Sequence, residues 1–244
     1  MKETMTDFWY RTMEIIFKLP GAKIDREKFL REVLTKGGAT QDQVNNAIET
    51  TPAKAGISKL LIEDISNSCI RSHKIKAALT STAAGLPGGL AGIGAIPADF
   101  IQFYWHIIVL IQKLAYLHGW PDLMAGEIDR DVISRFTMFI GVMLGLGSAK
   151  KGVALMTEIY TKSALTTAKK FLDSSIAKII EQILLRLGIN IGRERISKTI
   201  GIAIPVIGGA IFGITTYNTF GTMGENLREH LSKLPFAVTG YSGQ

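Results

Sequence analysis

Apolar residues recur along most of the chain at intervals of three and four positions, which is the pattern of amphipathic helices. No segment alternates apolar and polar residues as a strand does, and no Asn-Gly or Asp-Gly pair marks a hairpin turn. We therefore expect an all-α protein that forms a single helical bundle. The pattern predicts helices over residues 7–19, 25–36, 41–50, 55–80, 97–118, 130–149, 153–187 and 193–232.

The first of these helices places Trp9, Met13 and Ile16 on one apolar face. Two interpretations fit this face. The helix packs on the protein's own core, as amphipathic helices usually do, or it lies in a membrane interface with its aromatic residues among the headgroups. The second interpretation predicts membrane contact by Phe8 and Trp9.

Three stretches of the chain lack charged residues: 77–98 (up to Asp99), 136–149 and 199–224. A helix needs about 20 apolar residues to span a bilayer, and prolines or polar residues interrupt the two longer stretches. Such segments suit the centre of a helical bundle or a shallow membrane hairpin, and we expect glycine-rich apolar helical hairpins at the centre of the bundle. Small residues recur every four positions, which favours close packing of helices; they are Gly201, Pro205, Gly209 and Gly213, with shorter series at Gly85/Gly89, Gly88/Gly92 and Gly141/Gly145.

The order of these features resembles the EcsC protein family. A glycine-rich apolar segment is followed by Pro97-x-Asp99, then by a helix with Leu-Ile-x-x-Leu-Ala spacing and an aromatic-Gly ending, and a Pro-x-x-Gly segment comes late in the chain. The resemblance covers roughly residues 40–232. Its ending here is His118-Gly119, where family members more often carry Tyr-Gly. The residues that match the family motif are Gly85, Pro87, Gly88, Gly89, Pro97, Asp99, Gly119, Pro205, Gly208, Gly209 and Gly213.

This resemblance implies a bacterial, membrane-associated protein named from a genetic neighbourhood with an ABC transporter. It carries over no enzymatic chemistry, and the chain holds no ATPase signature of its own. The expected role is an accessory or regulatory factor at the cytoplasmic face of the cell membrane, with a membrane transporter or another membrane protein as partner. The corresponding domains are N-terminal amphipathic helices over 1–39, an EcsC-like helical domain over 40–232 and a flexible tail over 233–244.

The net charge favours an anionic partner. Lys and Arg number 28 against 21 Asp and Glu, and many of them follow the second apolar stretch, beginning with Lys150-Lys151. Basic residues that flank apolar segments suggest contact with the lipids of an anionic inner leaflet, although a solvated helix face explains them equally well. Nucleic acid is not an expected partner, because no helix-turn-helix spacing appears and aromatic residues are not interleaved with the basic ones.

No catalytic, metal or cofactor site is predicted. Four histidines are scattered, without the spacing of a zinc site; they are His73, His106, His118 and His230. The single cysteine, Cys69, has no evident histidine partner and is interpreted as a structural residue.

Asp99 is the only fixed charge between Lys76 and Lys113. Near a helix start, its carboxylate complements the positive helix end. The alternative is a buried ion pair with Arg135, Arg195 or Lys198, since an unpaired buried charge costs several kcal/mol.

Three classes of function remain. The first is the non-enzymatic, membrane-associated protein of the EcsC type. The second is a pore-forming or toxin-like protein that stores an apolar hairpin and releases it into a membrane. The third is an enzyme whose site the sequence does not reveal. The N-terminus lacks the pattern of a secretory signal, so we expect the protein on the cytoplasmic side.

Overall fold

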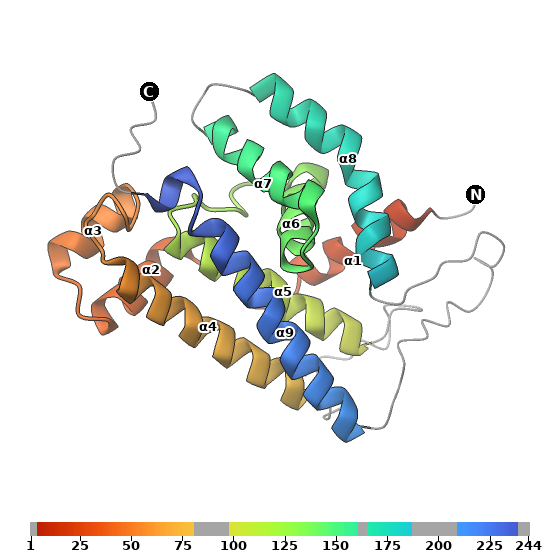
Figure 1. Cartoon of the computed structure of the whole chain (residues 1–244), viewed down its shortest axis with the longest axis horizontal. Coiled ribbons are helices and arrows are strands. Elements are labelled where there is room, and N and C mark those ends of the chain that lie inside the picture. Colours follow the sequence, from red (N-terminus) through yellow and green to blue (C-terminus); the bar gives the residue numbers. More distant parts are fainter. Residues whose placement is uncertain (1–3, 81–97, 161–164, 187–208, 239–244) are drawn as a thin grey trace.

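The computed structural model describes residues 4–80, 98–160, 165–186 and 209–238. These residues form α-helices, one short 3-10 helix and no strand, which confirms the all-α bundle (Figure 1). The glycine-rich hairpins predicted at its centre fall largely outside the described residues. The helices are α1 (Met5–Phe17), α2 (Arg26–Lys36), α3 (Gln41–Glu49), α4 (Lys59–Thr80), α5 (Ala98–Leu117), α6 (Arg130–Met143), α7 (Gly147–Tyr160), α8 (Leu165–Arg186) and α9 (Gly209–Leu231), followed by η2 (Pro235–Ala237).

Local signals explain where several helices begin and end. Thr40 and Gln43 form the capping box expected at the start of α3, each side chain bonding to the other residue's backbone. The single helix predicted over 130–149 is wrong, because α6 ends at Met143 and α7 begins at Gly147. Gly145 adopts φ +75°, a left-handed conformation that ends a helix and that glycine adopts at little cost.

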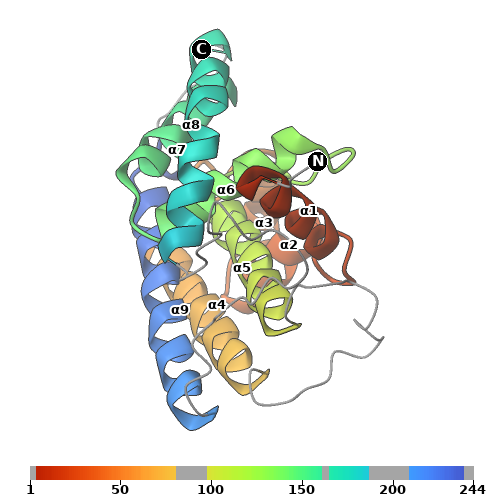
Figure 2. The ribbon, with the colours of Figure 1, turned by 90° about the vertical axis from the view of Figure 1, so that its right-hand side faces the viewer.

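Helix α5 is the central element of the fold, with α1, α2, α4, α6 and α9 packed around it (Figures 1 and 2). Among the described helices, it is the one long and apolar enough to cross a membrane. Of its residues Phe100–Leu117, 78% are buried inside the protein. Its apolar surface is therefore covered by other helices in this conformation, as expected for the core helix of a bundle.

Helix α1 packs into the same core, so the membrane contact predicted for Phe8 and Trp9 does not agree with the structure. Both side chains are buried. The indole Nε1–H of Trp9 donates a hydrogen bond of 2.8 Å to Thr137 Oγ1, and the rings of Trp9 and Tyr104 pack edge to face with 5.4 Å between centroids. The physical reason is that α5 and α6 offer both an apolar surface and a polar acceptor for the indole.

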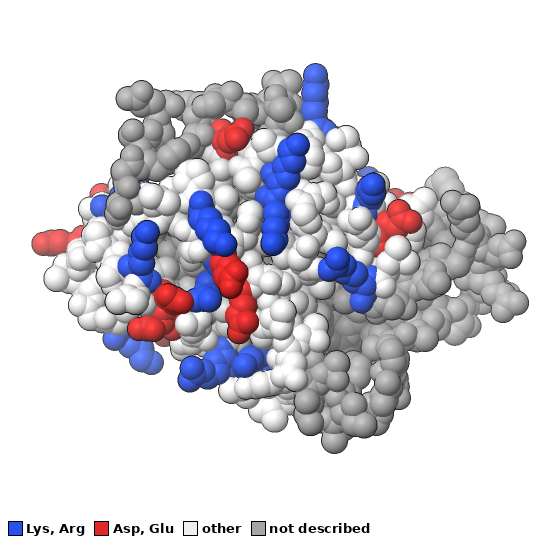
Figure 3. Space-filling model, viewed as in Figure 1, with Lys and Arg blue, Asp and Glu red and all other residues white. Residues whose placement is uncertain are grey.

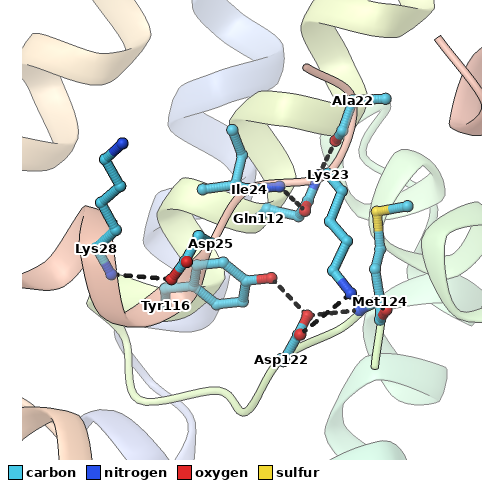
Figure 4. A network of polar contacts seen from close by, with 9 residues as sticks. All are labelled: Ala22, Lys23, Ile24, Asp25, Lys28, Gln112, Tyr116, Asp122 and Met124. Carbon is cyan, nitrogen blue, oxygen red and sulfur yellow. Dashed lines mark hydrogen bonds and ion pairs between the residues drawn. The ribbon is translucent and has the colours of Figure 1, made fainter. Parts of the chain in front are cut away.

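The turn between α1 and α2 is fixed to α5 by polar contacts (Figure 4). The side chain of Gln112 accepts a hydrogen bond from the Ile24 backbone N–H (2.9 Å) and donates one to the Ala22 carbonyl (2.7 Å). Nearby, the Tyr116 hydroxyl donates to Asp122 Oδ1 at 3.0 Å. Because buried polar groups are costly when unpaired, the two bonds of Gln112 allow α5 to carry this glutamine inside the core.

The guanidinium of Arg26 caps the C-terminal end of α3. It donates from Nη1 to the carbonyl of Ile48 (2.8 Å) and from Nε to that of Trp120 (3.0 Å). Two longer contacts of 3.5 Å reach the carbonyls of Ala47 and Thr50. The last carbonyls of a helix have no partner within it, and a single side chain here supplies donors to several of them.

The chain after α9 also packs on the bundle as far as it is described. Leu234 is buried, and the ring of Phe236 meets that of Trp120 with 5.4 Å between centroids. The flexible tail predicted over 233–244 is therefore wrong for residues 233–238. Residues 239–244 lie outside the described part of the chain.

Candidate functional site

Three helix ends that border or lie within the uncharged segments are close together. Helix α4 runs antiparallel to α5 (Figure 1). It also runs antiparallel to α9, since Glu63 meets Arg228 and the later Lys74 meets the earlier Tyr217. The C-terminal end of α4 therefore lies beside the N-terminal ends of α5 and α9 (Figures 1 and 2). We call this part of the molecule the converging end.

Basic and apolar side chains share the exposed surface of α4 near the converging end. Ile75 and Leu79 are exposed to 42% and 64%, and Arg71 and Lys76 are exposed beside them. The sequence has no acidic residue between Asp64 and Asp99. On the face shown in Figure 3, lysine and arginine side chains are spread over the described surface, with fewer acidic ones among them.

A buried polar cluster joins α4 to α5 directly beneath this surface. Lys113 Nζ lies 3.2 Å from His73 Nε2, and His73 Nδ1 lies 3.2 Å from His106 Nδ1. His73 and His106 are only 3% and 5% exposed. A lysine ammonium only donates hydrogen bonds, so His73 Nε2 accepts, His73 Nδ1–H donates to His106 Nδ1, and the proton of His106 lies on Nε2.

Burial keeps both imidazoles neutral. It lowers the pKa of His73 to about 3 and that of His106 to about 4, and the charges of Lys113 and Lys76 add to the effect. Burial also lowers the pKa of the Lys113 ammonium. Nearby on α4, burial raises the pKa of the Cys69 thiol, which opposes the thiolate that a reactive cysteine needs and fits the structural role predicted for it.

This cluster was not predicted from the sequence. Within each helix the spacing was visible, because Cys69, His73 and Lys76 share one face of α4, and His106 and Lys113 lie two turns apart on α5. The sequence does not show that these two helices pack against each other. Among the described residues, no group of three or more His, Cys, Asp or Glu side chains is placed to hold a metal ion.

Two pockets lie on the surface where α4 and α9 pack against each other. One has a volume of about 310 Å³ and is bordered by Arg71, Lys74 and Arg228 together with acidic residues. Arg228 forms an ion pair with Glu63, and its buried Nε–H has no hydrogen-bond partner among the described residues. The other pocket, of about 360 Å³, lies toward the opposite end of α4 and reaches His118.

The structure separates the predicted basic contacts from the converging end. Lys150 and Lys151 are exposed on α7. Lys150 lies near His230, and its charge lowers the pKa of that imidazole, after the larger effect of burial. His230 is 13 positions beyond Tyr217 along α9, or about 20 Å at the rise of a helix. Lys150 and Lys151 therefore lie toward one end of α9, and the basic residues of α4 near Tyr217 lie toward the other.

Few residues of the predicted family motif fall in the described part of the chain. Gly119 does, with φ +84°, and Gly209 and Gly213 lie in α9. Asp99 lies in the first turn of α5, but its side chain is outside the description, as are Arg195 and Lys198, so its pairing stays a prediction. The remaining motif residues lie outside the described part of the chain: Gly85, Pro87, Gly88, Gly89, Pro97, Pro205 and Gly208.

The chain matches no known family model, no curated protein and no solved structure in comparisons by sequence and by fold. The resemblance to EcsC proteins therefore rests on the motif residues alone and stays a prediction.

Proposed function

We propose that the protein is a non-enzymatic, membrane-associated helical protein that contacts the anionic cytoplasmic leaflet through the converging end. In this role it acts as an accessory or regulatory factor of the EcsC type. One observation carries the proposal. The C-terminal end of α4 and the N-terminal end of α5 flank an uncharged, glycine-rich segment, and α9 begins within another. These three helix ends lie together, beside exposed basic and apolar side chains of α4.

The expected binding energy suits reversible association. A basic residue near an anionic membrane surface contributes about 1 kcal/mol. Arg71, Lys74 and Lys76 together contribute about 3 kcal/mol on that basis. Ile75 and Leu79 add apolar surface that the protein itself leaves exposed. Such a surface binds a membrane in the manner of an interfacial amphipathic helix rather than a spanning one.

Vesicle co-sedimentation tests which basic group contacts the membrane. We expect the wild-type protein to bind vesicles that contain an anionic lipid and not purely zwitterionic ones. Replacing Arg71 and Lys76 by glutamine removes two cations, which is expected to weaken binding about 30-fold, from about 2 kcal/mol of lost attraction.

The matched control replaces Lys150 and Lys151 by glutamine, which changes the net charge equally at the other end of α9. We expect that variant to bind nearly as well as the wild type. Equal losses in both variants would show that net charge alone drives binding, and absence of binding by the wild type would refute the proposal.

A second function is favoured by α5 itself. This helix is long and apolar enough to span a membrane, is buried at the centre of the bundle, and directly follows an uncharged segment in the chain. That arrangement fits a pore-forming protein that stores an apolar hairpin. Dye release from the same vesicles separates the two functions, because a peripheral factor binds without leakage and a pore former releases the dye.

A further inference from the structure

The buried histidines lie close to the ends of the two helices that flank residues 81–97. His73 is seven positions before the end of α4, and His106 is eight positions after the start of α5, about two helical turns in each case. The rings meet edge to face with 5.4 Å between centroids. The cluster therefore holds α4 and α5 together close to the converging end.

We propose that His73, His106 and Lys113 form an acid-sensitive latch, which keeps α4 against α5 at neutral pH and releases them when the two imidazoles take up protons. We call these three residues the histidine latch. The proposal deepens the proposed function, on which it rests for its biological meaning, because release of α4 would uncover the apolar face of α5 at the surface that contacts the membrane.

Each hydrogen bond of the latch needs a lone pair that a proton would occupy. A proton on His73 Nε2 faces the Lys113 ammonium at 3.2 Å, and a proton on His106 Nδ1 faces the N–H of His73 at the same distance. Protonation at either site therefore replaces a hydrogen bond by two opposed donors. A proton on His73 also places two like charges in contact inside the bundle, where their repulsion is weakly screened.

The groups around the latch do little to compensate such a charge. On α4 it faces Lys76, whose charge opposes protonation of both histidines, and the neutral thiol of Cys69. From α2, Glu32 acts favourably on Lys113. Helix α9 contributes Tyr217 to this end of α4, and its ring is covered by the ammonium of Lys74 at 4.1 Å.

The direction in which pH shifts the latch follows from the histidine pKa values of its closed and released states. In the closed state, the pKa values of His73 and His106 are about 3 and 4. A solvated histidine in the released state returns to about 6.5. Between these values the released state binds more protons, so release becomes more favourable as the pH falls. Full solvation of either ring multiplies the released population by up to about 100 between pH 7.5 and 4.5, and partial solvation leaves an expected increase of at least about tenfold.

The single cysteine reports release without any added probe site. Cys69 lies one turn before His73 and is partly buried. Its rate of reaction with 4,4′-dithiodipyridine is measured from pH 7.5 to 4.5 and divided at each pH by the rate for the unfolded protein, which removes the intrinsic pH dependence of the thiol. We expect the ratio to rise at least about tenfold while the far-ultraviolet circular dichroism stays unchanged.

Glutamine variants test the origin of the rise. In His73→Gln, the amide retains a donor and an acceptor but takes up no proton in this range, so the rise is expected to be lost in large part. His106→Gln is the second latch variant, in case the first fails to fold. The control is His118→Gln, which removes a histidine that is 5% exposed like His106 but bonds to the Leu114 carbonyl at the far end of α5. We expect it to keep the full rise.

Three results would overturn the latch: a ratio that does not change with pH in the wild type, an equal rise in the latch variants, or a rise that accompanies loss of helical signal. The measurement uses no lipid, so its failure is distinguishable from failure of vesicle binding at pH 7.5, which tests the proposed function alone.

Discussion

Replacing Trp9 by alanine is expected to lower the free energy of unfolding by about 3–5 kcal/mol. The indole is fully buried, and its removal leaves a cavity between α1, α5 and α6. It also leaves the Thr137 hydroxyl, which donates to the Ile133 carbonyl, without the hydrogen bond that it accepts from the indole. Urea denaturation followed by circular dichroism measures the loss.

The companion variant Trp9→Phe separates packing from hydrogen bonding. It keeps most of the aromatic surface and is expected to cost about 1–3 kcal/mol, since an acceptor then remains buried without its donor. A Trp9→Ala protein with wild-type stability and weakened vesicle binding would contradict the buried arrangement. That result would restore the interpretation of α1 as a membrane anchor.

Replacing Gly119 by alanine is expected to cost about 2–5 kcal/mol. Its φ of +84° is a conformation that costs other residues about 1–2 kcal/mol. A Cβ at this position would also lie 2.7 Å from the backbone carbonyl oxygen of Phe236 and 2.9 Å from Cβ of Thr51. Relieving those clashes requires movement of backbone, and such overpacking costs about 1–3 kcal/mol. Thermal denaturation is the measurement.

Gly126→Ala is the matched control for Gly119→Ala. Gly126 has φ +86°, but an added Cβ meets no atom within 4 Å. We expect this substitution to show the conformational cost alone, about 1–2 kcal/mol. Equal losses at the two positions would mean that the chain after α9 does not pack against Gly119 as the structure places it.

Helix periodicity predicted the fold class because apolar spacing depends only on local sequence. The capping box at Thr40 and Gln43 was identified for the same reason. The break between α6 and α7 was missed because Gly145 lies in an uncharged stretch whose apolar spacing continues on both sides. A glycine there serves a helix interior or a helix end, and only its φ of +75° decides between them.

The candidate site was predictable only in part. Uncharged, glycine-rich segments and basic residues are visible in the sequence, but the meeting of three helix ends depends on tertiary packing. His73 and His106 are 33 positions apart, and no local pattern shows that their helices run antiparallel. For Trp9, an apolar face looks the same whether lipid or protein covers it, and the acceptor on Thr137 lies 128 positions away.

The guanidinium of Arg26 has a consequence for how the molecule opens. Since one side chain holds carbonyls of the α3 end and of Trp120 after α5, fraying of any of these parts breaks bonds that the others share. The start of α2, the end of α3 and the end of α5 are therefore expected to exchange their amide hydrogens as one cooperative unit. Arg26→Lys, which supplies a compact charge instead of a planar fork of donors, should let the three parts exchange at different rates.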